Sequence, residues 1–168
     1  MSDFSKLTNL SDYIAQKNSH QRALWRTYQA SLTQAVIHSD KKINHDFRCG
    51  EDGAVYFRLF NHFLIRINSG ETFYSQQIIY SLNISPDDEE MNFEPFACAR
   101  LSDDGRVDGI VDIRNKASVL DHYLGKISII YQCIFDAMEN NQPVHAALGK
   151  LLRHCASGSE KQQGIAHS

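Results

Sequence analysis

The chain has 168 residues, of which 42% are hydrophobic, and its formal net charge is −3. This length suits one domain with a sizeable core, and the slightly acidic balance argues against a broad nucleic-acid-binding surface, which is usually basic. The polar N-terminus lacks the apolar stretch of a secretory signal, and no apolar run approaches the roughly 20 residues that span a membrane. The four cysteines form no CxxC pair, so we expect a cytoplasmic protein with reduced thiols.

The first predicted element is a long amphipathic helix that begins at Ser11 or Asp12 and ends near His38. Either residue is a good N-cap, and the segment that follows contains neither Gly nor Pro. One stripe recurs at steps of three, four or seven residues, as on one face of a helix. Its members are Ile14, Gln21, Trp25, Tyr28, Leu32 and Ala35, with Leu24 and Val36 widening it.

From Ile43 to Ile113 the spacing changes to alternation, which predicts β-strands. The alternating sets are Val55, Phe57 and Leu59; Phe63, Ile65 and Ile67; and Tyr74, Gln76, Ile78, Tyr80 and Leu82, with Phe96 to Leu101 as a further candidate. Short turn signals lie at 50–53, 68–71 and 103–105, so neighbouring strands should be antiparallel. Residues 85–94 form an acidic loop.

A second long helix is predicted to start near Asn115 and to end before Pro143. Its apolar stripe consists of Leu120, Tyr123, Leu124, Ile127, Ile130, Tyr131, Ile134 and Met138. Gly125 inside it costs about 1 kcal/mol relative to Ala, and close packing against the sheet is the simplest reason to tolerate it. Val144, Leu148, Leu151 and Leu152 predict a short last helix, and the polar composition after Cys155 predicts a frayed tail.

These elements predict an α+β fold, a two-layer sandwich. An antiparallel meander of about four to six strands should carry the long N-terminal helix and the long C-terminal helix on one face, because each helix has one apolar stripe to bury. Residues 1–155 would form a single domain and residues 156–168 a flexible tail. The other sheet face carries Arg, Gln and Ser with some aromatic residues, so it is either solvated or partly covered by a partner, which leaves a homo-oligomer possible.

No motif in the chain predicts catalysis, a metal site or a cofactor. Counting from Asp104 as the first ligand of a calcium loop places Arg106 at position three and Asn115 at position twelve, which does not fit an EF-hand. The pairs His45 with Cys49 and His154 with Cys155 lack the spacing of a zinc site. Phosphate-binding, dinucleotide-binding and nucleophile-elbow motifs do not occur, so we do not expect a bound nucleotide.

The order of residues in several segments resembles the formate hydrogenlyase regulatory proteins of enterobacteria. The segments that carry this resemblance are Asp12–Gln16, Leu59–Phe63, Asp104–Gly109, Arg114-Asn115, Val119–Ile127 and Ala137–Val144. They span roughly Leu10 to Val144, whereas the loop at 85–95 and the chain after Ala147 depart from the family pattern. The resemblance implies a small cytoplasmic repressor of the formate hydrogenlyase and hydrogenase-maturation operons. It implies opposition to the formate-sensing transcriptional activator and no enzyme activity.

Two hypotheses for the mechanism follow. Residues 17–48 carry six Lys or Arg, while residues 87–112 carry nine Asp or Glu, an opposition that suggests steering toward a protein partner and equally fits simple solubility. The protein is therefore either an anti-activator that binds the activator, or a DNA-binding repressor that uses the basic first helix. The candidate partner-interface residues are Arg22, Arg26, Arg114, Lys116 and His122, although ordinary solvated side chains explain each of them as well.

Overall fold

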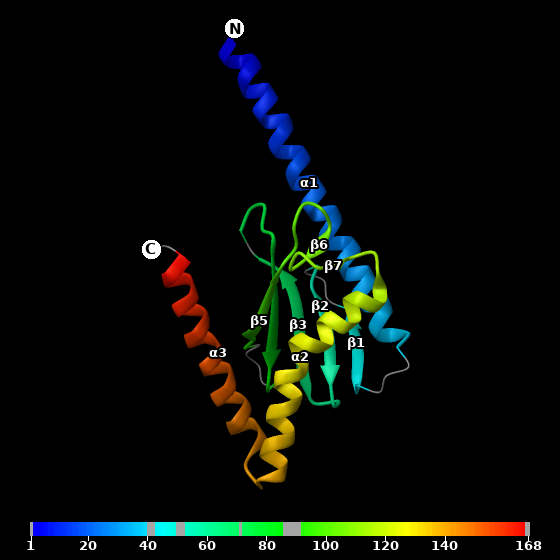
Figure 1. Cartoon of the computed structure of the whole chain (residues 1–168), viewed down its shortest axis with the longest axis vertical. Helices are drawn as coiled ribbons and strands as arrows, with labels where there is room; N and C mark the ends of the chain where they lie inside the picture. The colour runs from blue at the N-terminus through cyan, green and yellow to red at the C-terminus, as the bar shows by residue number, and fades with distance from the viewer. Residues whose placement is uncertain (1, 40–42, 50–52, 71, 86–91, 167–168) are drawn as a thin grey trace.

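The computed structural model describes residues 2–39, 43–49, 53–70, 72–85 and 92–166. A five-stranded antiparallel sheet and three helices form an α+β fold, as predicted from the sequence. The first helix, α1 (Ser2–Ile37), and the second, α2 (Lys116–Glu139), both contribute buried side chains to the core on one face of the sheet. The third, α3 (Val144–Ala166), packs beside β5 and α2 (Figure 1).

The first helix starts earlier than the sequence predicts. It begins at Ser2, so Ser11 and Asp12 lie inside it and do not cap it. A residue caps a helix only where the chain before it is not helical, and residues 2–10 contain no Gly or Pro to stop the helix. The first part of α1 extends away from the rest of the molecule (Figure 1), and Ile14, expected in the buried stripe, is exposed there.

The sheet is a simple meander in which strand order follows chain order. The strands are β1 (His45–Cys49), β2 (Val55–Leu59), β3 (Phe63–Ser69), β4 (Gln77–Asn83) and β5 (Glu94–Arg100). Phe57 pairs with Ile65, and Ile65 pairs with Leu82. Because directly paired residues lie on the same side of a sheet, these three side chains share one face. The sequence placed Tyr74 and Gln76 on the same strand as Ile78, but in the structure both residues precede β4. Of the turns predicted from the sequence, residues 50–52 and 71 lie outside the described part, as do residues 86–91 of the acidic loop.

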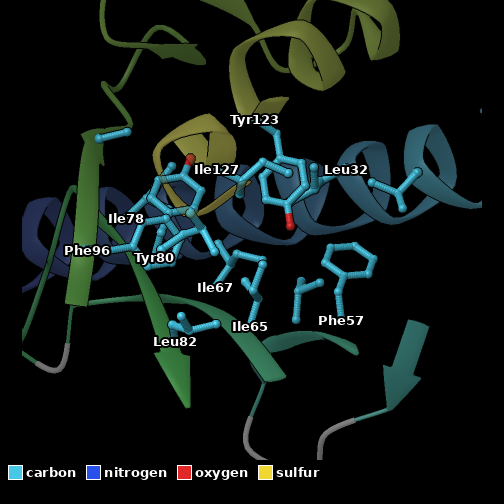
Figure 2. Close-up of a cluster of buried hydrophobic side chains, with 14 of the residues drawn as sticks. Leu32, Phe57, Ile65, Ile67, Ile78, Tyr80, Leu82, Phe96, Tyr123 and Ile127 are labelled. Atoms are coloured by element: carbon cyan, nitrogen blue, oxygen red, sulfur yellow. The ribbon is translucent and has the colours of Figure 1, made fainter. Parts of the chain in front are cut away.

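The core lies between this sheet face and the two long helices. Leu32 of α1, Tyr123 and Ile127 of α2 and side chains from the strands converge in one cluster (Figure 2). Tyr80 of β4 shows that both helices reach the same face, because its hydroxyl lies 2.7 Å from the hydroxyl of Tyr28 in α1 and its ring lies beside that of Tyr123 in α2. In the second helix, Met138 was expected in the buried stripe but is exposed.

A small hairpin connects the sheet to α2. It consists of β6 (Arg106–Val107) and β7 (Val111–Asp112). Gly109 lies in its turn and Gly105 directly before β6, and both glycines have positive φ, +73° at Gly109 and +79° at Gly105. At Gly105 this agrees with the turn predicted at 103–105, since glycine adopts that backbone conformation without a steric penalty. Asn115 then caps α2 by accepting a hydrogen bond from the backbone N–H of Ser118 at 3.2 Å.

Two expectations about the C-terminal half are wrong. Gly125 is exposed, and a Cβ built there would meet no atom within 4 Å, so close packing does not explain this glycine. The last helix is also not short, because α3 continues to Ala166. The division of the chain into a domain up to residue 155 and a tail beyond it stays a prediction.

Candidate functional site

The five candidate interface residues separate into two groups. Arg22 and Arg26 of α1 both line one cleft beside the ends of β2 and β3, and the other three candidates do not line it. Arg114 and Lys116 are exposed where the hairpin meets α2, and Arg114 lies 4.0 Å from the carboxylate of Asp112. The structure therefore does not bring the five residues into a single patch.

His122 makes an internal contact. Only 9% of its side chain is exposed, and its Nε2 lies 2.8 Å from the carboxylate of Asp108. That carboxylate also lies 3.3 Å from Lys126 Nζ and accepts a hydrogen bond from the backbone N–H of Arg100. Burial raises the pKa of Asp108, but the bonds from His122 and Arg100 and the charge of Lys126 outweigh it, so the pKa lies below its ordinary value. This network ties the hairpin to α2.

The three aspartates tested above as calcium ligands, Asp104, Asp108 and Asp112, instead form hydrogen bonds with the backbone or with α2. Asp104 accepts a hydrogen bond from the N–H of Arg106, and Asp112 accepts one from the N–H of Arg114, which are local turn contacts. Asp108 is held as described above. Within the described residues, no three His, Cys, Asp or Glu side chains lie together as metal ligands would.

His45 belongs to a partly buried hydrogen-bonding cluster with Tyr123 and Tyr131. His45 Nε2 lies 2.8 Å from the hydroxyl of Tyr123, and its Nδ1 lies 3.1 Å from the hydroxyl of Tyr131. Burial lowers the pKa of His45 to about 4, against the smaller opposing effects of the Ile43 carbonyl and Asp46. A neutral His45 thus joins β1 to α2, which is a structural role.

Two of the thiols, on α2 and α3, are made less reactive by burial. Burial raises the pKa of Cys133 and of Cys155, with the charge of Asp136 adding to the effect at Cys133. The thiolate is the nucleophilic form of cysteine, so raised pKa values reduce reactivity at neutral pH.

The most exposed apolar surface is the projecting segment, residues 3–16 of α1. Every side chain in it is exposed, and its large apolar residues each expose between 49% and 76% of their surface; these are Phe4, Leu7, Leu10, Tyr13 and Ile14. Asp3 and Asp12 outnumber Lys6, so the segment has no excess positive charge. Contiguous exposed apolar residues commonly mark a surface that binds a partner.

The apolar face of the projecting segment continues the face that the rest of α1 buries. Alternating steps of three and four run through positions 7, 10, 14, 17, 21, 24, 28 and 31, the spacing of a helix seam. From Gln21 onward these positions are buried against the domain. Leu7, Leu10 and Ile14 occupy the same seam with no part of the described chain packed on them.

A second apolar surface is a groove along α2 with a volume of about 580 Å³. The residues that line it are Ile43, Phe60, Leu124, Ile127, Ser128, Tyr131, Gln132, Ile134, Phe135 and Met138. Phe135 and Met138 are well exposed. The sequence placed Met138 in the buried stripe of α2. In the structure neither the sheet nor α3 covers this side chain, so the C-terminal part of that stripe is exposed.

The chain is similar to a characterised group of bacterial regulators. A family model described as "Transcriptional repressor of hyc and hyp operons" matches residues 2–149. The formate hydrogenlyase regulatory protein HycA of Escherichia coli K12 is 35% identical over 140 residues, which cover 83% of this chain and 90% of that protein. The HycA proteins of Escherichia coli O157:H7 and Shigella flexneri match to the same extent. No solved structure gives a significant match, and no helix in the described residues is long and apolar enough to cross a membrane.

Proposed function

Because the chain belongs to the family of transcriptional repressors of the hyc and hyp operons, we propose that it represses by binding the formate-sensing activator through the projecting segment. The observation that carries this proposal is the exposed apolar seam of α1, with Leu7, Leu10 and Ile14 on the face that the same helix buries elsewhere. A seam of this spacing fits an apolar groove or a second amphipathic helix on the partner. Binding would lower the population of productive activator to the extent that the repressor prefers one of its states.

The charges of α1 favour a protein partner over DNA. A helix that grips DNA places Lys and Arg against the phosphates, but the projecting segment has one Lys against two Asp. Arg22 and Arg26 lie further along, in a cleft formed with the chain's own sheet. Direct DNA binding by the basic part of α1 is the alternative, and it predicts promoter binding that weakens steeply with salt.

The direct test measures binding of purified activator to the full chain, with and without formate. The double variant Leu7→Glu, Leu10→Glu places two charges on the seam. We expect it to weaken binding by about a hundredfold, because it replaces two leucines that the partner would bury in the complex. The matched control Ser5→Glu, Asn9→Glu adds the same charges to the other side of the exposed helix and should bind as the wild type does. Far-UV circular dichroism should show both variants folded.

Three outcomes would overturn the proposal. The first is no binding at micromolar concentration in either condition. The second is equal binding by the seam variant and the control, which would move the interface elsewhere. The third is a dimer of the wild type that the seam variant alone disrupts while activator binding persists, because the seam would then hold a second copy of the chain. A band-shift with promoter DNA tests the DNA-binding alternative, which predicts a shifted band at low salt that disappears as the salt concentration rises.

A further inference from the structure

A polar cleft separates α1 from the ends of β2 and β3. It encloses about 540 Å³ and is lined by Arg22, Trp25, Arg26, Gln29, Gly53, Ala54, Arg66, Asn68, Ser69 and Gly70. A second cavity of about 480 Å³ adjoins it, since Arg22, Trp25, Ser69 and Gly70 border both. The wall at Gly53 is fixed to the helix, because its carbonyl accepts hydrogen bonds from Trp25 Nε1 and from Gln29 Nε2.

Three arginines line this cleft without a carboxylate beside them. Arg22 and Arg26 come from α1, and Arg66 comes from β3. No Asp or Glu is among the described residues that line either cavity, and none of these arginines forms an ion pair within the described part of the chain. Lys17, by contrast, lies on the same helix and pairs with Asp103 at 3.1 Å. The positive charge of the cleft is therefore not neutralised by the described side chains.

Some residues that line the two cavities, Arg66 and Asn68 in the first and Gln21 in the second, have buried polar atoms that lack partners among the described residues. The Nε of Arg66 has no acceptor, although its guanidinium lies over the ring of Phe93 at 4.3 Å. The Oδ1 of Asn68 and the Oε1 of Gln21 have no donor, and Gln21 is itself almost fully buried. Unsatisfied buried polar groups cost free energy, so they are rare unless something binds them.

We propose that this arginine cleft binds a small oxyanion with two or more negative charges. Guanidinium groups hold phosphates and carboxylates through paired hydrogen bonds, and three of them match more than one negative charge. The volume lies in the range of small-molecule sites, roughly 300 to 1,000 Å³, and exceeds what a single monovalent ion fills. The amide oxygen of Asn68, which lines the same cleft, would accept a hydrogen bond from a donor elsewhere on the ligand.

Trp25 gives a direct readout of binding, because it is the only tryptophan of the chain and it borders both cavities. The experiment titrates the full-length protein with pyrophosphate and with citrate by tryptophan fluorescence, and with ATP by calorimetry. Pyrophosphate tests phosphate alone, citrate tests carboxylates, and ATP adds a planar base. We expect a saturable change with at least one probe.

The variants test whether the cleft is responsible. Arg22→Ala and Arg26→Ala should each weaken binding by about tenfold or more, since each removes a charged hydrogen-bonding group. Arg22→Lys keeps the charge without the planar fork and should fall between the wild type and Arg22→Ala. Arg153→Ala, at an exposed position on α3 outside the cleft, is the matched control and should bind as the wild type does.

The proposal fails if no probe binds at millimolar concentration. It also fails if Arg153→Ala weakens binding as much as the cleft variants do, because the effect would then be one of net charge. The measurement uses the purified chain alone, so its outcome is independent of whether the activator binds the projecting segment.

Discussion

The two halves of α1 share one apolar spacing and differ in what covers it. From Gln21 to Ser31 the seam is buried against the domain, and Leu32 beside it is fully buried as well. From Leu7 to Ile14 the same seam is exposed, on the part of α1 that extends away from the rest of the molecule (Figure 1). Periodicity therefore identifies the apolar face of a helix, while the length of the sheet beneath it decides which part of that face the domain itself covers.

The largest expected difference between the halves comes from truncating one leucine in each. Leu32→Ala should lower the free energy of unfolding by about 2 to 5 kcal/mol, because it leaves a cavity in the core. Leu10→Ala should change it by less than about 0.5 kcal/mol, because its side chain is already exposed. Chemical denaturation of both variants measures this, and similar losses would show that the projecting segment is buried in solution.

Acid should act on the buried body, since the projecting segment contains no histidine. His45 has a pKa of about 4 in the fold and about 6.5 when unfolded, so between these values the unfolded chain binds more protons. The free energy of unfolding should therefore fall as pH is lowered from 6.5 to 4, by on the order of 3 kcal/mol. His45→Phe should remove this part of the pH dependence, whereas His154→Phe, at an exposed position, should keep it. An unchanged slope in His45→Phe would contradict the assignment.

A smaller contrast tests one hydroxyl in each half. Tyr28→Phe removes the group that lies 2.7 Å from the Tyr80 hydroxyl inside the core, and it should cost about 1 to 2 kcal/mol because a buried hydroxyl loses its partner. Tyr13→Phe removes an exposed hydroxyl and should leave the free energy of unfolding unchanged. Thermal unfolding of the two variants checks this, and equal midpoints would argue against the buried Tyr28–Tyr80 pair.

The smallest predicted effect applies the same comparison to α2, where one face is buried and the other is exposed. Gly125→Ala should stabilise the protein by about 1 kcal/mol, because alanine is the better helix former and nothing lies within 4 Å of the added Cβ. Gly105→Ala is the control and should destabilise, since its φ of +79° strains any other residue. A loss of stability in Gly125→Ala would mean that a partner covers this helix face.

Much of the fold follows from local patterns. Alternation in β2 and β3 places Phe57 and Ile65 inside, and Asn115 marks the start of α2, because strand pleat and helix capping depend on residues close in sequence. The same alternation puts Arg66, which lies between the inward residues Ile65 and Ile67, on the other face of β3. It did not join Arg66 to Arg22 and Arg26, since a cleft between a helix and a distant strand depends on packing.

The sequence by itself determined most of the elements, the inward face of β2 and β3 and the family of the chain, because all of these are written in residue order. Only the tertiary structure decided that residues 3–16 project with an uncovered seam, that Gly125 faces open space, and that His122 is enclosed beside Asp108. It also decided that three arginines from two elements share one cleft. The physical reason is that burial and charge compensation are properties of contacts between distant segments, and local spacing does not encode which segments meet.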